Sequence, residues 1–255
     1  MISLRFLPDI AVIFMLAFGR LGALCMLMPG TGESGIPQRV RLALALLLTL
    51  MFYPAVAGYY PTGLANNVPK LVVYLGAEIA VGIFLGLVGR IVLSAGQVAG
   101  TIIANQLGLG FAMTVDPSQG QQGVIFGNFL SMLAMTMIFV TDLHHLSVAA
   151  LGSSFTLFRP GEWMPVGDFA QVAVKLVADS FRIGLQVSAP FLAFGLVFNL
   201  GLGVLAKLMP QLQIFFIATP LSIGGGMVLF ALLISTIMLW YIDHVRDGLS
   251  QLVAS

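Results

Sequence analysis

The chain has 255 residues, of which 59% are hydrophobic and only 8% are charged, and its formal net charge is +1. This composition excludes an ordinary soluble domain, and high hydrophobicity with little charge also excludes intrinsic disorder. The near-zero net charge gives no indication of a nucleic-acid partner. Because the apolar runs are long and unbroken rather than short and alternating, they predict an all-α integral membrane protein and not a transmembrane barrel.

Six apolar stretches are each long enough to supply the roughly 20 residues that a helix needs to cross a bilayer. In chain order they cover about 10–28, 39–57, 71–93, 124–141, 181–206 and 214–240. We therefore predict a single membrane domain, 1–255, that contains about six long apolar helices arranged as hairpins. The only cysteine is Cys25, so an intrachain disulfide is excluded.

The segment from Leu71 to about Gln106 exceeds a simple span. It contains no proline, and polar residues recur along it at helical spacing. As one helix it would be roughly 54 Å long, whereas the hydrocarbon core of a bilayer is about 30 Å thick. We therefore expect this helix to tilt, to break or to leave the membrane.

The segment 168–186 predicts an amphipathic helix that runs directly into an apolar one. Its polar face consists of Asp168, Gln171, Lys175, Asp179, Arg182 and Gln186. This face mixes two cations with two anions, whereas a helix lying on anionic lipid would be rich in Lys and Arg. We expect the face to contact protein or a water-filled lumen; the alternative is a solvated loop helix.

Three charged residues, Arg20, Glu78 and Arg90, lie inside apolar stretches, where a charge is costly and is normally paired. The simplest arrangement is an ion pair between Arg20 and Glu78. A proton relay or an ion site is the alternative. Structural pairing is favoured because the apolar stretches supply one acid and no chain of carboxylates.

The motifs of catalysis and cofactor binding are missing. The sequence TDLHH at 141–145 offers Asp142, His144 and His145, but adjacent histidines on a helix point about 100° apart and rarely bind one ion. No nucleophile elbow, phosphate loop or dinucleotide fingerprint is present. We therefore expect no enzyme activity, no cofactor and no metal. The glycine pairs 82/86, 96/100 and 123/127 predict close helix packing.

The segment 106–123 interrupts the apolar pattern with a long, glycine-rich stretch. Gly108, Gly110 and Gly120 give the backbone freedom, and Asp116-Pro117 favours a tight turn. Between the glycines stand Phe111, Ala112 and Met113, which together form a compact apolar group. Non-helical backbone at membrane depth is tolerated only inside protein or beside water. The pattern predicts a constriction or gate; the alternative is a plain connecting loop.

Three stretches carry a resemblance that runs nearly end to end. They are AGQVAGTIIANQLGLGFAMTVDPSQG, SSFTLFRPG and NLGLGVLAKLMPQLQIFFIATPLSIGGG. On these motifs the chain resembles the FliR family, subunits of the type III protein export gate. Asn199, Pro210, Gln211 and Pro220 match the family pattern at the hairpin turn, while Lys207 stands where Arg is common.

The resemblance implies a channel-forming subunit that assembles with FliP and FliQ, is contacted by FlhB and FlhA, and passes unfolded flagellar proteins across the bacterial inner membrane at the basal body. It also implies a FliP-like portion, about 1–180, followed by a FliQ-like hairpin and tail, about 181–255. The segment 106–123 corresponds to the family's plug loop. The equivalent subunit of a virulence type III secretion system and a small-molecule membrane transporter remain as alternatives.

Overall fold

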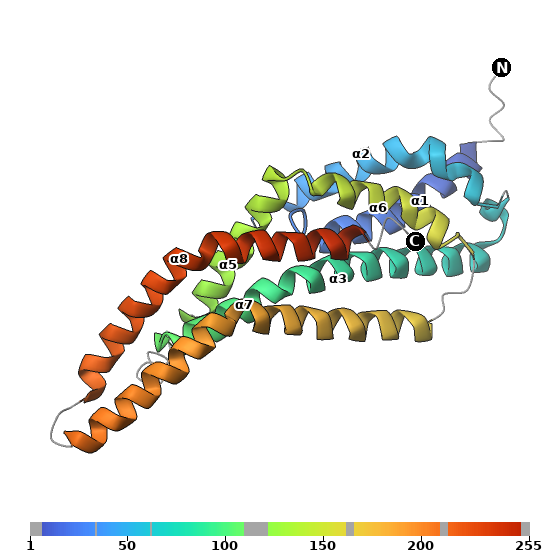
Figure 1. Ribbon diagram of the computed structural model, residues 1–255. Coiled ribbons are helices and arrows are strands. Elements are labelled where there is room, and N and C mark those ends of the chain that lie inside the picture. The colour runs from blue at the N-terminus through green and yellow to red at the C-terminus, as the bar shows by residue number, and fades with distance from the viewer. Residues whose placement is uncertain are drawn as a thin grey trace. The chain divides into compact units, whose positions relative to one another are not determined.

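Long helices make up the part of the chain that the computed structural model describes, which is residues 7–33, 35–61, 63–109, 122–161, 166–209 and 214–250, and no strand occurs in it. Two short 3-10 turns follow α2. The helices in chain order, labelled in Figure 1, are α1 (Leu7–Leu27), α2 (Gln38–Val56), α3 (Val68–Gln106), α5 (Gln122–Val140), α6 (His144–Leu157), α7 (Val166–Leu208) and α8 (Ile214–Ser250). The predicted all-α fold is confirmed.

Within the described residues, five helices are long and apolar enough to cross a membrane, and a bent pair makes a sixth candidate if it is counted as one span. The five are Asp9–Leu27, Gln38–Tyr59, Val68–Gln106, Phe169–Leu208 and Phe216–Gly248, and the pair is Phe126–Val140 with His144–Leu157. The expectation of about six long apolar helices agrees with this. The sequence did not show that the pair is bent by 79°.

The bend lies at Asp142, whose φ of 57° places it in the left-handed region. A left-handed residue cannot continue a right-handed helix, so α5 ends before it and α6 starts after it. Aspartate tolerates this conformation better than most residues do. The hydropathy pattern did not predict α6, because the aspartate and the two histidines at 142–145 interrupt the apolar run.

The two over-long segments both form continuous helices. Helix α3 has 39 residues and α7 has 43. At about 1.5 Å per residue these helices are roughly 58 and 64 Å long, about twice the thickness of the hydrocarbon core. The polar start of α7 therefore does run directly into its apolar part, and on it Gln171, Lys175 and Arg182 are exposed.

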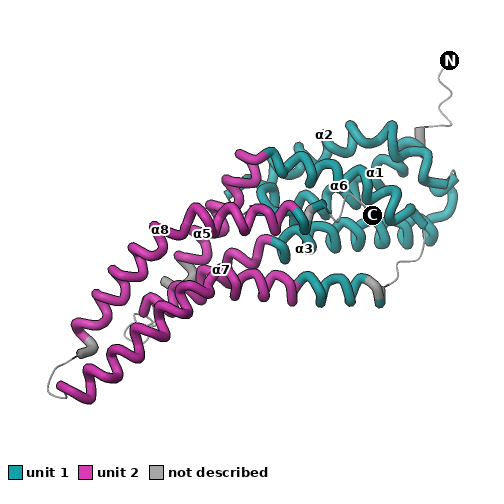
Figure 2. Tube along the Cα trace, in the orientation of Figure 1, with its two compact units in different colours: residues 1–92, 142–176, 247–255 teal, residues 93–141, 177–246 magenta. Residues whose placement is uncertain are grey.

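The chain divides into two compact units, shown in different colours in Figure 2. Unit 1 comprises residues 1–92, 142–176 and 247–255, and unit 2 comprises 93–141 and 177–246. The core of unit 1 joins α1, α3 and α6 with the end of α2 and the segment after it. Its buried members are Leu16, Ala17, Leu21, Leu24, Val56, Tyr60, Leu64, Val81, Leu85, Leu151 and Phe155.

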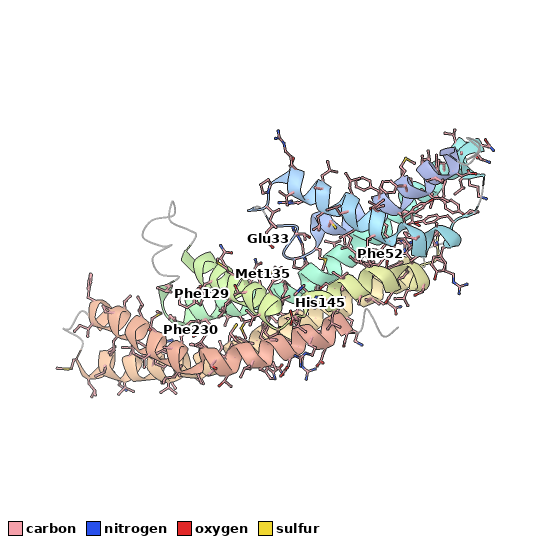
Figure 3. The ribbon with its side chains drawn as sticks, turned by 90° about the horizontal axis from the view of Figure 1, so that it is seen from above. Glu33, Phe52, Phe129, Met135, His145 and Phe230 are labelled. Carbon is pink, nitrogen blue, oxygen red and sulfur yellow. The ribbon has the colours of Figure 1, made fainter. Side chains whose placement is uncertain are left out.

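Unit 2 is held by a backbone contact and by an aromatic cluster. A Cβ atom on Gly100 of α3 would overlap Gly127 of α5, so the two backbones touch there. Phe230 of α8 packs against Phe126, Phe129 and Phe191, with ring centroids 5.4, 6.1 and 6.1 Å away. Figure 3 labels Phe129 and Phe230. Residues from α5, α7 and α8 thus meet at one ring.

We expect Gly100→Ala to destabilise the protein, because the added methyl group would lie 2.7 Å from the carbonyl carbon of Phe126 as well as against Gly127. Overpacking of this kind costs about 1–3 kcal/mol. The matched control is Gly76→Ala on the same helix, where a Cβ meets nothing within 4 Å. Thermal unfolding in mild detergent should show a lower midpoint for Gly100→Ala alone. Equal midpoints for the two variants would contradict the backbone contact.

Candidate functional site

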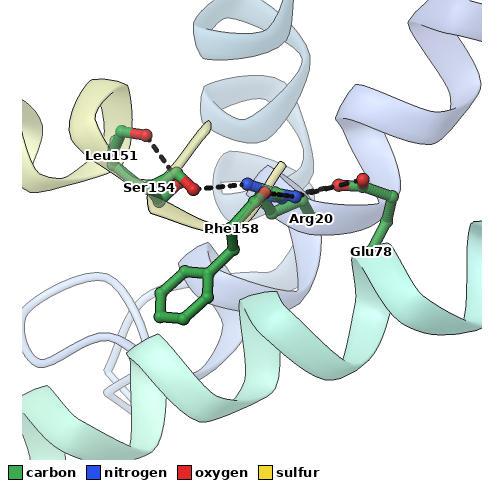
Figure 4. Close-up of polar contacts among 5 residues, drawn as sticks. All are labelled: Arg20, Glu78, Leu151, Ser154 and Phe158. Atoms are coloured by element: carbon green, nitrogen blue, oxygen red, sulfur yellow. Dashed lines mark hydrogen bonds and ion pairs between the residues drawn. The ribbon is translucent and has the colours of Figure 1, made fainter. Parts of the chain in front are cut away.

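Arg20 and Glu78 form a two-pronged ion pair inside unit 1, between α1 and α3 (Figure 4). The Nε of Arg20 donates to Oε2 of Glu78 at 2.5 Å, and its Nη2 donates to Oε1 at 3.1 Å. Both residues are 1% exposed. The structure therefore brings together the two residues for which the sequence predicted a pair. Bidentate pairing is the strongest geometry available to an arginine and a carboxylate.

Arg20 is also bound to the end of α6. Its Nη1 donates to the carbonyl oxygen of Ser154 and its Nη2 donates to that of Phe158, both at 2.8 Å. The guanidinium carbon lies 4.3 Å from the ring centroid of Phe155. The last carbonyl groups of a helix carry partial negative charge, so a cation is favourable there. Sequence reasoning missed this third helix, because backbone acceptors leave no signal in a sequence.

Glycines let α1 and α3 approach closely enough for the pair to form. A Cβ on Gly82, one turn after Glu78, would overlap the carbonyl oxygen of Arg20. A Cβ on Gly86, one turn further, would lie 2.6 Å from the Cβ of Leu27. These two glycines, predicted to pack closely, thus lie where α3 contacts α1.

Near this site, Tyr60 is buried just beyond the end of the second candidate span, and this burial raises the pKa of its hydroxyl.

Arg90 does not join this site, and its prediction as a buried charge is wrong. Its side chain is exposed, and it donates from Nε to the carbonyl of Leu27 at 2.7 Å and from Nη2 to that of Gly32 at 3.1 Å. The physical reason is the length of α3. Arg90 lies 20 residues after Lys70, which is about 30 Å along a helix and so one hydrocarbon thickness away.

The side chains of Asp142, His144 and His145 gather at the bend between α5 and α6. Their ligand atoms lie within 4.8 Å of one another, and the two histidine rings are 4.2 Å apart. Asp142 has a left-handed conformation and its carboxylate lies near the histidines, a proximity that the helical spacing alone did not indicate. Asp142 and His145 are exposed, and exposed groups of this kind are common without an ion, so we assign none to them.

Most of the predicted gate lies outside the described residues: Gly110, Phe111, Ala112, Met113, Asp116, Pro117 and Gly120. Its entry is described. Gly108 has a φ of 80°, a conformation that only glycine adopts readily. The preceding Leu107 is fully buried and touches Gly226 of α8, where a Cβ would overlap its side chain. The segment therefore starts from a fixed point.

The predicted residues of the C-terminal hairpin are partly described. Asn199 and Lys207 are exposed on α7, and Pro220 is exposed inside α8. Pro210 and Gln211 lie outside the described residues. Pro220 has no N–H group to donate to the turn before it, so the carbonyl of Phe216 loses its helical partner.

Comparison with known proteins identifies the family. A model described as "Bacterial export proteins, family 1" matches residues 11–248. The chain belongs to this family. Among relatives of the export family, the flagellar biosynthetic protein FliR of Caulobacter vibrioides is 40% identical over 236 residues, which cover 91% of this chain and 92% of that one.

Two further relatives of the export family are more distant. The flagellar biosynthetic protein FliR of Escherichia coli is 32% identical over 241 residues, covering 92% of this chain and 88% of that one. The Yop proteins translocation protein T of Yersinia pestis is 27% identical over 183 residues, covering 69% and 67%. The chain is thus similar over most of its length to proteins whose names refer to flagellar biosynthesis and to protein translocation.

The buried pair predicts that the double variant is more stable than either single variant but less stable than the parent. Arg20→Leu or Glu78→Leu alone leaves a buried charge unpaired, which costs about 3–5 kcal/mol. The double variant removes both charges and should recover part of this loss, but not all, because the carbonyls of Ser154 and Phe158 lose their donor. The measurement is accumulation of the protein in membranes together with its thermal unfolding.

The exposed pair Arg246–Asp243 on α8 is the control, with nitrogen and oxygen 3.6 Å apart. Neutralising either partner there should change stability little, since exposed pairs contribute roughly 0–1 kcal/mol. A double Arg20/Glu78 variant that is no more stable than the single variants would show that the two charges do not support each other.

Proposed function

We propose that the chain is a channel-forming subunit of the flagellar type III protein export gate. It assembles with FliP and FliQ, is contacted by FlhB and FlhA, and passes unfolded flagellar proteins across the bacterial inner membrane. The observation that carries this proposal is the similarity over nine-tenths of the chain to flagellar biosynthetic proteins. The weaker similarity to the Yersinia translocation protein makes a virulence secretion system the second candidate.

The C-terminal hairpin supports assembly with further subunits. Helices α7 and α8 run side by side toward Leu208 at the end of one and Ile214 at the start of the other (Figures 1 and 3). Yet only 11% of the most apolar 18-residue segment of α7 is buried within the chain. Large apolar side chains are exposed on both helices, among them Leu196, Val197, Leu200, Val204, Phe216, Ile217, Leu221, Val228 and Leu232. In our proposal FliP and FliQ cover part of this surface and lipid covers the rest.

A polar stripe in α3 supports a water-filled conduit. Gln97, Thr101 and Asn105 are spaced four residues apart, so they lie on one face of the helix, and all three are exposed. The opposite face, with Ala99 and Ile103, is fully buried. Hydrocarbon would not accept such a stripe. The stripe leads directly into the segment 106–123, which in our proposal is the plug.

The plug has to hold back ions at rest and move aside for an unfolded chain. Apolar side chains such as Phe111 and Met113 can close a narrow pore by excluding water from it. The described entry fits a hinge, because Leu107 is held against Gly226 while Gly108 takes a left-handed conformation. The segment would therefore move about a fixed end.

The assembly proposal is tested by co-expression. Together with FliP- and FliQ-like subunits, the chain should co-purify in mild detergent as one complex. Without them it should aggregate or be degraded, because the exposed polar stripe and the exposed apolar faces have no cover. A stable, monodisperse single chain that does not bind FliP or FliQ would contradict the proposal.

The plug proposal is tested by deleting about 110–116. We expect the complex to assemble but to leak small ions when no substrate is present, because the apolar closure is gone. Membrane conductance or dye influx gives the readout, with motility measured in parallel. If the deletion variant assembles and remains as impermeable as the parent, the segment is not the plug.

The proposed hinge at Gly108 is tested with a matched control. Gly108→Val should assemble, stay impermeable and export poorly, because a β-branched residue strongly disfavours a φ of 80°. Gly63 has a φ of 78°, and a Cβ added there would meet nothing within 4 Å, so Gly63→Val introduces similar backbone strain elsewhere. Only the Gly108 variant should lose export, and equal export by the two variants would contradict the hinge.

A further inference from the structure

A pocket of about 660 Å³ lies in unit 1 at the turn between α1 and α2, and it has no role in the function proposed above. Figure 3 labels Glu33 in this turn. The lining residues come from the turn, from the start of α2 and from α3: Gly32, Glu33, Ile36, Pro37, Gln38, Arg41 and Arg90. Pockets that bind small ligands are typically about 300–1,000 Å³ in size.

The pocket is electropositive. Its charged side chains are Arg41, Arg90 and Glu33, which leaves one net positive charge. The N-terminus of α2 adds partial positive charge, since Pro37 supplies no side-chain cap and the first turn contains no acidic residue. Among the residues that the structure describes, neither arginine forms an ion pair.

Both guanidinium groups are held in place, and their bonds to described residues leave N–H groups unused. Arg90 donates from Nε and Nη2 to the carbonyls of Leu27 and Gly32, and Arg41 donates from Nε and Nη2 to those of Ile36 and Glu33. A guanidinium carries five N–H donors, so each arginine has donors left for another acceptor. These backbone bonds orient the two groups before any ligand binds, which lowers the entropic cost of binding.

The positions of the lining residues along the helices indicate where the pocket lies relative to the candidate spans. The first span ends at Leu27, and the second begins at Gln38. Arg90 stands about 30 Å from Lys70 along α3, which is the thickness of the hydrocarbon core. The pocket therefore lies at the ends of two candidate spans, and we take this position as the level of the lipid phosphates.

The outer face of α2 continues from the pocket as an apolar surface. Val40, Leu47 and Leu50 are 54%, 64% and 64% exposed and share one side of the helix at spacings of seven and three residues. A free phosphate ion would gain nothing from this surface. A phospholipid would use both parts, with its headgroup in the pocket and its acyl chains along α2.

We infer that this pocket binds the phosphate of an anionic phospholipid. Arg41 and Arg90 donate hydrogen bonds to the phosphate oxygens beside the N-terminus of α2, and Glu33 limits the affinity through its like charge. This inference requires only that the protein is inserted in a membrane, so it does not depend on the export function.

The test uses the full chain, isolated in the assembly in which it is stable, with phosphatidylglycerol as the probe and native mass spectrometry as the readout. Arg41→Gln combined with Arg90→Gln should lower the affinity about tenfold or more, since two charge-assisted bonds are lost. Arg39→Gln is the control for loss of positive charge near the pocket, because it removes one charge two residues from Arg41 but does not line the pocket. It should bind within about twofold of the parent.

Glu33→Gln separates binding from folding. This change leaves the backbone carbonyl that Arg41 uses, and it should raise the affinity, which a folding defect would not do. Inorganic phosphate at millimolar concentration should not displace the lipid; displacement would assign the site to free phosphate instead. Equal lipid binding by the parent and the double arginine variant, or unchanged binding by Glu33→Gln, would overturn the inference.

Discussion

The buried guanidinium of Arg20 constrains unit 1 more than any other group. An arginine cannot lose its charge, so each of its buried N–H groups requires an acceptor. Its acceptors come from positions 58, 134 and 138 residues away, on α3 and at the end of α6. Because all of them must be in place at once, this one side chain determines where three helices meet. An alternative packing of these helices would leave a buried charge unsatisfied, which is far more costly than a change in apolar contacts.

Close backbone approach accompanies this constraint in both units. Within a bilayer the hydrophobic effect does not drive helices together, since lipid is as apolar as leucine, so contact area and hydrogen bonds determine the packing. Gly82 allows the carbonyl of Arg20 to touch α3, and Gly100 allows α5 to touch α3 at Gly127. The glycines of α3 are therefore contact points for different partners along one helix.

The sequence predicted features that depend on a long periodic run of residues or on a residue type that is rare in the apolar stretches. The two over-long helices followed from uninterrupted periodicity, and the partner of Arg20 followed because Glu78 is the only acid inside the apolar stretches. Features that depend on the backbone conformation of a single residue, or on the position of a residue relative to the hydrocarbon, were not predicted. The bend at Asp142 rests on one dihedral angle. The prediction that Arg90 is buried is wrong because hydropathy does not show where along a helix the hydrocarbon ends. The carbonyl groups that bind Arg20 are present at every residue, so composition could not distinguish them.

The length of α3 explains why one helix carries three kinds of charged or polar position. Glu78 lies within the first 30 Å or so and must be paired. Arg90 lies about 30 Å along the helix from Lys70, where its exposed side chain binds backbone carbonyls. The 16 residues that follow extend about 24 Å further, and there Gln97, Thr101 and Asn105 are exposed. A helix that stayed in lipid could not keep that stripe. The part of α3 after Arg90 therefore needs water or a polar protein surface beside it, and this requirement is what a subunit lining an export channel would satisfy.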